Sequence, residues 1–250
     1  MQNARYYLNR ASTLATRWNI ETCHARLQET FADVPLTKDA IPRVCYIKEY
    51  DLLYNRIQKN ANSNTMVLWN HLVNARMDSV IKSRNKIAHL HDLGSATLSR
   101  LGRSRSLLVI RDPYSRVLSA FLDKFRRPAI RQEHGDFDLA PAGFARFVAW
   151  LEEDGLEKNA HWDLQTKQML LPLGRYTDVV RFERYGQGML EFLRELGVPE
   201  EKLAFSGLVT HGARHATGAD EKLAAFYDRD TRRRVAKIYE ADFAALGYGI

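Results

Sequence analysis

The chain has 250 residues, of which 45% are hydrophobic and 27% charged, a balance typical of one globular domain and too short for a second full domain. No run approaches the roughly 20 apolar residues of a membrane-spanning helix, and arginines interrupt residues 1–20, so we expect neither a signal peptide nor an anchor. Two cysteines exclude a disulfide framework and favour a cytoplasmic setting. The formal net charge of +7 favours an anionic partner without identifying it.

The predicted elements alternate between helices and strands. Residues 1–32 have a mainly helical pattern that ends before Pro35, because the residue preceding a proline disfavours helix. Short apolar runs predict strands at 52–57, 107–110 and 179–182, each followed by a predicted helix, at about 65–77, from Pro113 onward and at 187–196. This order indicates an α/β fold, P-loop-like and three-layered, with a central, mostly parallel sheet flanked by helices. We expect residues 1–250 to form one domain, with 1–40 as a helical extension packed on it.

The segment after the first strand has the composition of an anion-binding loop. It reads Gln58-Lys59-Asn60-Ala61-Asn62-Ser63-Asn64-Thr65. Main-chain amides at a helix start converge on an anion, small side chains let the anion approach, and Lys59 adds a positive charge. The nucleoside-triphosphatase pattern is absent, since Lys59 precedes the turn instead of ending it. Helix capping explains the Asn, Ser and Thr residues equally well, so this segment alone leaves both interpretations open.

The run after the second strand is more specific. Residues 110–125 read IRDPYSRVLSAFLDKF. They closely resemble the 3′-phosphate-binding motif of sulfotransferases, particularly the carbohydrate sulfotransferases of sulfotransferase family 2, which include the HNK-1, chondroitin and dermatan enzymes. The resemblance implies that Arg111 and Ser119 hold the 3′-phosphate of the donor, and a guanidinium with a nearby hydroxyl suits that group. An ordinary helix start capped by Asp112 explains each residue singly, but not the whole run.

Other segments carry the same resemblance. Residues 59–65 are similar to the family's 5′-phosphosulfate loop, which implies that Lys59 and the amides after it bind the phosphosulfate, although many members have proline where this chain has Gln58. Residues 159–162, 180–183 and 238–248 resemble further family landmarks, and the lack of cysteines after Trp162 fits a bacterial-type member. The resemblance implies 3′-phosphoadenosine-5′-phosphosulfate as co-substrate, adenosine 3′,5′-bisphosphate as product and a carbohydrate or glycoconjugate acceptor.

Sulfuryl transfer needs a base for the acceptor hydroxyl, and histidine is the side chain best suited to it near neutral pH. His89 and His91 lie between the two phosphate motifs and resemble a paired-histidine segment of related glycan sulfotransferases. We expect His91 to be the base, with Asp92 as a possible orienting partner, whereas two surface histidines in a polar loop are the plainer interpretation. His161 competes for the role but fits packing or acceptor contact better. Lys59 is expected to neutralise the leaving phosphate oxygen.

The remaining charged residues fit several functions. Arg126, Arg127 and Arg131 suit an acidic sugar or a solvated surface equally well, and Thr217 with its neighbours Arg214 and His215 suits either a nucleotide cover or an ordinary loop. No metal-binding pattern is present. A kinase-like phosphotransferase shares the strand, loop and helix order, and the arginines at 232–234 leave a nucleic-acid-binding module as a second alternative. A relative that binds donor without catalysis is a third, which Lys59, Arg111 and Ser119 argue against. The acceptor and the oligomeric state are not readable from the sequence.

Overall fold

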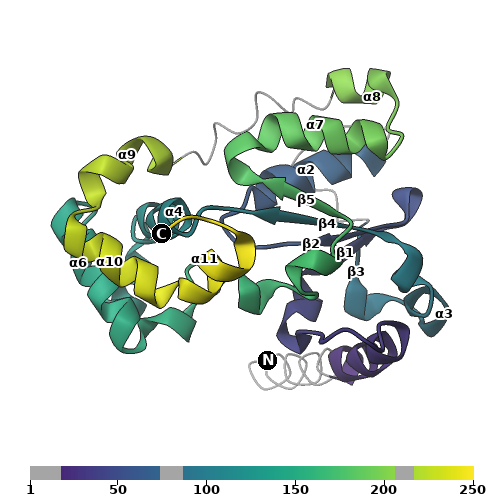
Figure 1. The fold of residues 1–250 in the computed structure, drawn as a ribbon, viewed down its shortest axis with the longest axis horizontal. Helices are drawn as coiled ribbons and strands as arrows, with labels where there is room; N and C mark the ends of the chain where they lie inside the picture. The colour runs from purple at the N-terminus through teal and green to yellow at the C-terminus, as the bar shows by residue number, and fades with distance from the viewer. Residues whose placement is uncertain (1–17, 74–86, 206–216) are drawn as a thin grey trace, which may run out of the picture.

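The computed structural model describes residues 18–73, 87–205 and 217–250. Its centre is a five-stranded sheet in the order β3-β1-β2-β4-β5 (Figure 1). The strands are β1 (Val44–Ile47), β2 (Leu52–Asn55), β3 (Ala88–His89), β4 (Arg105–Ile110) and β5 (Asp178–Arg181). β2, β4 and β5 are mutually parallel, and β1 runs antiparallel to both of its neighbours. The prediction of an α/β fold with a mostly parallel sheet is therefore confirmed.

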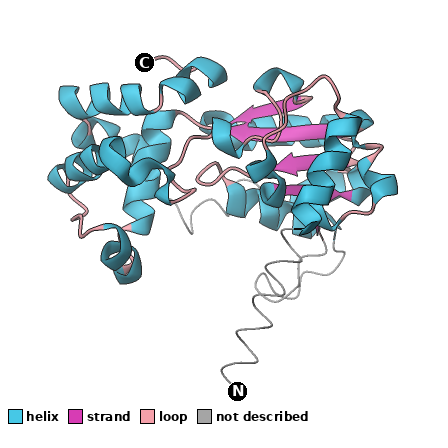
Figure 2. Ribbon diagram, turned by 90° about the horizontal axis from the view of Figure 1, so that it is seen from below, coloured by secondary structure: helices cyan, strands magenta, loops and turns pink. Residues whose placement is uncertain are grey.

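Both faces of the sheet are covered, which gives three layers (Figure 2). Alternate residues of a strand point to opposite faces, and here Leu52 and Tyr54 of β2 pack on one face while Leu53 packs on the other. The first face is covered by α2 (Asn62–Val73) and α7 (Tyr185–Glu195), through large side chains such as Trp69. Burial on both faces explains why β2 and β4 read as continuous apolar runs in the sequence.

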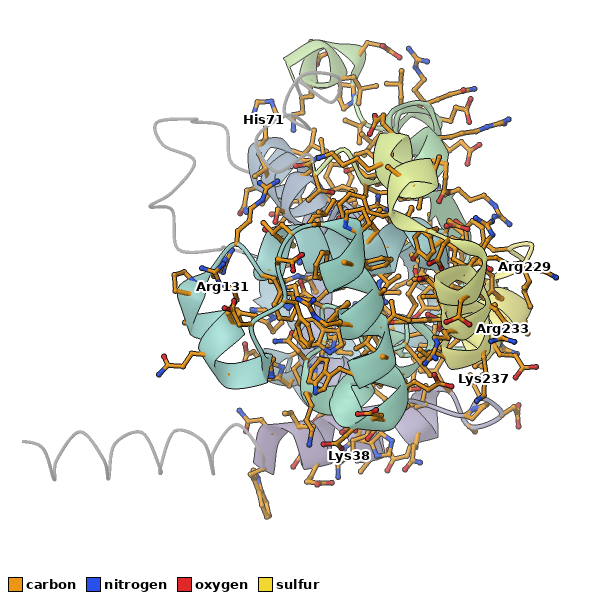
Figure 3. The ribbon with its side chains drawn as sticks, turned by 90° about the vertical axis from the view of Figure 1, so that its left-hand side faces the viewer. Lys38, His71, Arg131, Arg229, Arg233 and Lys237 are labelled. Carbon is orange, nitrogen blue, oxygen red and sulfur yellow. The ribbon has the colours of Figure 1, made fainter. Side chains whose placement is uncertain are left out.

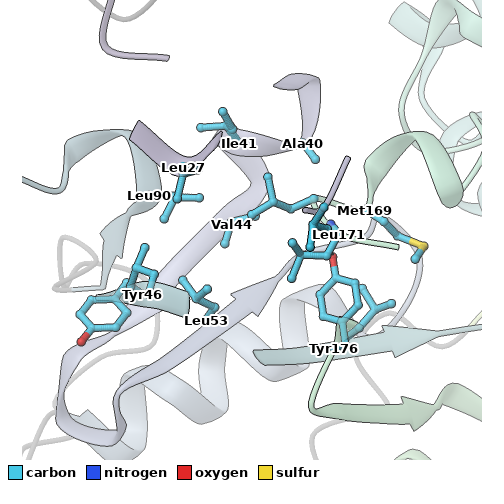
Figure 4. Close-up of a cluster of buried hydrophobic side chains, with 14 of the residues drawn as sticks. Leu27, Ala40, Ile41, Val44, Tyr46, Leu53, Leu90, Met169, Leu171 and Tyr176 are labelled. Atoms are coloured by element: carbon cyan, nitrogen blue, oxygen red, sulfur yellow. Dashed lines mark hydrogen bonds between the residues drawn. The ribbon is translucent and has the colours of Figure 1, made fainter. Parts of the chain in front are cut away.

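The opposite face is covered by the helical residues 18–30 and by residues 169–176, which precede β5. Figure 4 shows this cluster, in which Leu27 lies with Ile41, Val44 and Leu53 against the sheet. Residues 169–176 complete it through Met169, Leu171 and Tyr176. The N-terminal helix thus shares a core with β1 and β2, while the prediction of a single domain from 1 to 250 stays a prediction.

A helical group lies beyond the carboxyl ends of the strands and has its own aromatic core. Its members are α4 (Pro113–Lys124), α5 (Pro128–His134), α6 (Pro141–Trp150), α9 (Ala219–Phe226), α10 (Arg229–Ile238) and α11 (Glu240–Leu246). Phe121, Phe125, Phe147 and Trp162 lie at its centre in five ring pairs, stacked, tilted or edge-on, with centroids 5.1–5.8 Å apart. Two short helices, α3 (Ser95–Leu98) and α8 (Glu200–Phe205), lie elsewhere on the chain.

Some helix and strand boundaries differ from those predicted, and the local structure explains the differences. The first predicted strand ends at Asn55 rather than at residue 57, because the chain turns there into the loop before α2. Helix α2 begins at Asn62, three residues before the predicted start, and its predicted end lies outside the described residues. Helix α4 begins at Pro113 as predicted, with the Asp112 carboxylate accepting a hydrogen bond from the Ser115 amide.

Candidate functional site: a strand-end anion cavity

A cavity of about 510 Å³ opens at the carboxyl ends of β2 and β4, a volume within the range of small-molecule sites. Ligands of parallel sheets bind at this edge. The walls come from five parts of the chain: the loop after β2, the end of β4 with helix α4, the loop around His161, the residues between β5 and the start of α7, and the residues that open α9. The lining includes Lys59, Ala61, Asn62, Ser63, Asn64, Arg111, Ser119 and Thr217.

The loop between β2 and α2 is held by buried side chains that donate to its carbonyls. Arg116 donates from Nε to the Gln58 carbonyl at 3.0 Å, and Arg111 donates from Nη1 to the Lys59 carbonyl at 3.1 Å. The Asn60 amide donates to the Val109 carbonyl at 2.8 Å. These bonds tie the loop to β4 and α4, so its shape does not depend on a proline at position 58.

The same loop contains two non-glycine residues with left-handed backbone. Lys59 has φ of 71° and Ala61 has φ of 54°, a conformation that costs an L-residue free energy and persists where the surroundings enforce it. Ala61 then accepts the first helical hydrogen bond of α2, from the Thr65 amide at 2.9 Å. The amides of Asn62, Ser63 and Asn64 precede the first amide that donates within the helix, so they are directed to its open end. The loop thus gathers main-chain donors at the cavity wall.

Two of the predicted loop residues use their side chains inside the protein. Asn60 is buried, and its amide also donates to Gln165 Oε1 at 2.6 Å. Thr65 is fully buried, and its hydroxyl lies 2.9 Å from the Tyr185 hydroxyl. Neither residue lines the cavity, so both support the loop, whereas Lys59, Ala61, Asn62, Ser63 and Asn64 form its surface.

Arg111 and Ser119 form a second group in the cavity lining, next to the first loop. The Arg111 side chain is 4% exposed, and its guanidinium lies 3.8 Å from the centre of the Phe182 ring. Its Nε donates to Ser115 Oγ at 2.9 Å, and its Nη2 donates to Asp220 Oδ2 at 3.1 Å. Burial lowers the pKa of Arg111, but the guanidinium stays protonated at any physiological pH.

Ser119 lies in α4, two turns after Arg111, and receives a hydrogen bond from the Thr217 hydroxyl at 3.2 Å. Thr217 lies just before α9 and Asp220 in its first turn, so this part of the chain contacts both predicted 3′-phosphate ligands. The role of Thr217, as part of a nucleotide cover or of an ordinary loop, stays a prediction, and Arg214 and His215 lie outside the described residues.

Lys59 is paired with an acidic residue that the sequence reasoning did not single out. Its ammonium lies 3.1 Å from Asp123 Oδ2, and Lys124 lies 3.0 Å from the same oxygen. Burial lowers the pKa of Lys59. Burial would raise the pKa of Asp123, but the two ammonium groups outweigh it and bring the pKa to about 2. Asp123 is therefore a carboxylate that a bound anion must compete with.

His161 also lines the cavity, on a loop between the helical group and the sheet. Its Nδ1 lies 2.7 Å from Asn159 Oδ1. Burial, followed by the charges of Lys124 and Lys59, lowers the pKa of His161 to about 3, so the ring is neutral. The sequence motif around Trp162 identified this loop, but gave His161 second place among the candidate bases.

His89 and His91 lie away from the cavity. His89 is in β3 at the edge of the sheet, where β1 separates it from β2, so β3 is about 10 Å from β2. The rings of His89 and His91 stack with centroids 5.5 Å apart, and His91 lines a separate hollow beside Trp18 and Asp92. Their catalytic role stays a prediction. Burial and then the charges of His91 and Arg56 lower the pKa of His89, and Arg56 also hydrogen-bonds Asn62 of the cavity lining at 3.0 Å.

A buried polar scaffold behind the cavity was missed by the sequence reasoning. The Gln165 side chain accepts a hydrogen bond from the main-chain amide of Arg111 at 3.0 Å and donates one to the main-chain carbonyl of Arg111 at 2.8 Å. Because Gln165 also binds Asn60, it joins the end of β4 to the loop after β2. Asp242 of α11 in turn accepts from the amides of Gln165 and Thr166. The closing motif around Tyr239 pointed to this region, and Tyr239 donates to the Trp162 carbonyl.

The basic residues at 232–234 do not form an unpaired basic face. Figure 3 shows Arg229, Arg233 and Lys237 at the surface along α10. Arg233 pairs with Asp230, and Lys237 pairs with Glu152, each within 3 Å. Arg232 lies over the Tyr114 ring. This surface is mixed in charge, which weakens the nucleic-acid alternative.

Across residues 18–73, 87–205 and 217–250, every helix is too short or too polar to cross a bilayer. Over the same ranges, the His, Cys, Asp and Glu side chains form no group of three that could hold a metal ion.

The fold and cavity define a class: α/β proteins with a cavity at the carboxyl ends of adjacent parallel strands, lined by a main-chain loop and an arginine. Residues 42–249 match the family model described as the sulfotransferase family. This match covers most of the chain, so the protein belongs to sulfotransferase family 2 and is a transferase. No curated protein and no solved structure matches the chain.

Proposed function

We propose that the protein transfers a sulfuryl group from 3′-phosphoadenosine-5′-phosphosulfate to a hydroxyl of a carbohydrate or glycan-containing acceptor. The observation that carries the proposal is that both candidate anion sites line one cavity. They are also directly connected, because Arg111 donates to the Lys59 carbonyl at 3.1 Å. A nucleotide with phosphates at its 3′ and 5′ positions needs two such sites at a fixed spacing.

The residues divide the work between the two ends of the donor. The main-chain amides at the start of α2 suit the 5′-phosphosulfate, and Arg111 with Ser119 suits the 3′-phosphate. Lys59 is the residue that would stabilise the charge on the leaving phosphate oxygen, which is where charge develops as the sulfuryl group departs. The chemistry is positioning and electrostatics, since sulfuryl transfer resembles phosphoryl transfer in needing an in-line nucleophile.

The positive charge of the cavity supports the proposal of an acidic carbohydrate acceptor. Lys124 and Arg127 line the cavity near Asp123, so an acidic sugar would meet positive charge on its way to the donor. A histidine is proposed to remove the proton of the acceptor hydroxyl. Both cysteines are buried and unpaired, which supports the proposal of a reducing, cytoplasmic setting.

Ligand-dependent melting tests the donor. We expect adenosine 3′,5′-bisphosphate to raise the melting temperature at concentrations where ATP with magnesium has little effect, because binding to the native state stabilises it by mass action. Selective stabilisation by ATP would favour the kinase alternative instead. Salt-sensitive binding of random oligonucleotides, with no response to the bisphosphate, would favour the nucleic-acid alternative.

Transfer itself is tested with radiolabelled donor and a panel of unsulfated glycans, lipids and small alcohols. We expect label in a glycan product. Label confined to lipids or small alcohols would contradict the carbohydrate acceptor while leaving sulfotransfer intact.

A further inference from the structure

Among the residues that the structure describes, one histidine lines the cavity together with Lys59. His161 is half-buried at the wall that also contains Lys59, Asp123 and Lys124. His89 and His91 lie on the edge strand and in a separate hollow. A base must be within hydrogen-bond reach of the acceptor hydroxyl, and that hydroxyl must approach the sulfur in line. The position of His161 meets this requirement without any rearrangement of the sheet edge.

The hydrogen bonds of His161 fix its tautomer. Asn159 receives two hydrogen bonds from His161 on one side-chain atom, from the main-chain amide at 3.1 Å and from Nδ1 at 2.7 Å. Because a main-chain amide only donates, that atom is the amide oxygen of Asn159. An oxygen acceptor requires Nδ1 to carry the proton. Nε2 therefore carries the lone pair, as a general base requires.

The charges around His161 keep it neutral before the donor binds and adjust it afterwards. The groups that face it are Lys59 from the first loop and Asp123, Lys124 and Arg116 from α4. The three cations disfavour a protonated ring, and Asp123 favours it. A bound donor brings several negative charges next to Lys59, which offsets the cations. The ring then becomes a better proton acceptor when the donor is in place.

We propose that His161 is the catalytic base, with Asn159 as the residue that positions its ring; this inference rests on the proposed sulfotransfer. The acceptor oxygen forms a bond to sulfur while the bond from sulfur to the bridging phosphate oxygen breaks. The bonding electron pair stays on that oxygen, next to Lys59, and the hydroxyl proton moves to Nε2 of His161. Release of adenosine 3′,5′-bisphosphate restores the cationic surroundings, and His161 returns the proton to water.

The test compares His161→Gln with the wild-type protein and with His24→Gln, a half-buried histidine of the N-terminal helix. Transfer is measured from labelled donor to desulfated heparin, unsulfated chondroitin and simple disaccharides. Slow donor hydrolysis by water, a nucleophile that also needs a base, is measured in parallel. We expect His161→Gln to lose about 10²- to 10⁴-fold in transfer or hydrolysis. Its affinity for adenosine 3′,5′-bisphosphate should change less than about threefold, and His24→Gln should match the wild type.

A pH profile separates a base from a structural residue. At saturating donor, the wild-type turnover rate should fall at low pH as His161 becomes protonated, and this acid limb should be absent from His161→Gln. Asn159→Ala should lower the rate about tenfold and leave bisphosphate affinity unchanged, because the ring loses its partner while the donor site stays intact.

Two outcomes overturn the proposal. The first is a His161→Gln protein that keeps the wild-type rate, and the second is a comparable loss in His91→Gln with His161→Gln unaffected, which would restore the sequence prediction. Failure of the proposed function looks different: the wild-type protein would then neither bind the bisphosphate nor consume the donor.

Discussion

The two candidate anion sites of the cavity consist of different chemical groups. The first is largely main chain, shaped by two left-handed residues and held from behind by the buried groups Asn60, Gln165 and Arg116. The second consists of side chains, Arg111 and Ser119, that reach the cavity from one strand end and one helix. A main-chain site should lose affinity when the residues that hold its loop are replaced, whereas a side-chain site should lose affinity when its own ligand residues are replaced.

The comparison also shows how the sites depend on each other. Arg111 is a side-chain ligand of the second site and donates to the Lys59 carbonyl of the first. Gln165 binds Asn60 on one side and the main chain of Arg111 on the other. Mutations at this junction should affect both sites, and mutations at the periphery should affect one.

Among variants of the two anion sites, Lys59→Ala should have the largest effect, on the chemical step. Lys59 contributes charge at the place where the leaving oxygen develops it, so we expect transfer to fall about 10²- to 10³-fold. Affinity for adenosine 3′,5′-bisphosphate should fall far less, because the amides of α2 stay in place. Single-turnover rates and calorimetric binding measure the two quantities separately. Unchanged transfer would remove Lys59 from the mechanism.

Arg111→Lys tests the side-chain site with charge conserved. A lysine cannot reproduce the paired donors of a guanidinium, and hydrogen bonds to charged groups contribute about 1.5–3 kcal/mol each. We expect the bisphosphate to bind about 10- to 100-fold more weakly in equilibrium titrations. Ser119→Ala, which removes a single hydroxyl, should weaken it less than Arg111→Lys; the reverse order would argue against Arg111 as the main 3′-phosphate ligand.

Asn60→Ala tests the supports of the main-chain site. The variant removes the two buried hydrogen bonds that Asn60 donates to the Val109 carbonyl and to Gln165, and each such bond contributes about 0.5–1.5 kcal/mol. For a chain of this size that loss lowers the melting temperature by roughly 2–4 °C per kcal/mol. Scanning calorimetry should show this shift, together with weaker donor binding. Asn19→Ala, on the exposed surface of the N-terminal helix, is the matched control and should leave both quantities unchanged.

Asp220→Asn should have the smallest effect, and in the opposite direction. The Asp220 carboxylate pairs with Arg111 at 3.1 Å but is about half exposed, so the pair is weak. Removing its charge frees Arg111 for phosphate, and we expect the bisphosphate to bind about twofold to fivefold more tightly. Asp136→Asn, at another exposed ion pair, controls for net charge. Weaker binding in Asp220→Asn would show that Asp220 supports the cover over the site.

The sequence predicted the parts of the fold that carry strong local signals. The apolar run of β4 and the Asp112-Pro113 start of α4 are recognisable because burial on two faces and helix capping act on adjacent residues. The strands β1 and β3 were missed. β3 has two residues, which are too few for a pattern. β1 is as long as β2, but a three-residue 3-10 turn follows it instead of a helix, so it lacks the strand-then-helix order on which the prediction depended.

The same limit applies to the site. Lys59, Arg111 and Ser119 were predicted because they lie within contiguous motifs, and the structure brings all three to one cavity. Gln165, Asp220 and Asp242 were missed, since each reaches its partner across more than 50 residues of sequence. His91 was ranked above His161 on resemblance, and only the arrangement of the sheet shows which of them faces Lys59.

The carboxylate of Asp242 has a consequence for biosynthesis. Asp242 accepts hydrogen bonds from the main-chain amides of Gln165 and Thr166, and Gln165 in turn binds Asn60 in the loop after β2. The loop near residue 60 therefore depends on a residue that is synthesised about 180 positions later. A chain that is still bound to the ribosome, and whose α11 has not yet emerged, lacks the hydrogen bonds of Asp242. Nucleotide capture should therefore begin only after residues 240–246 have emerged from the ribosome.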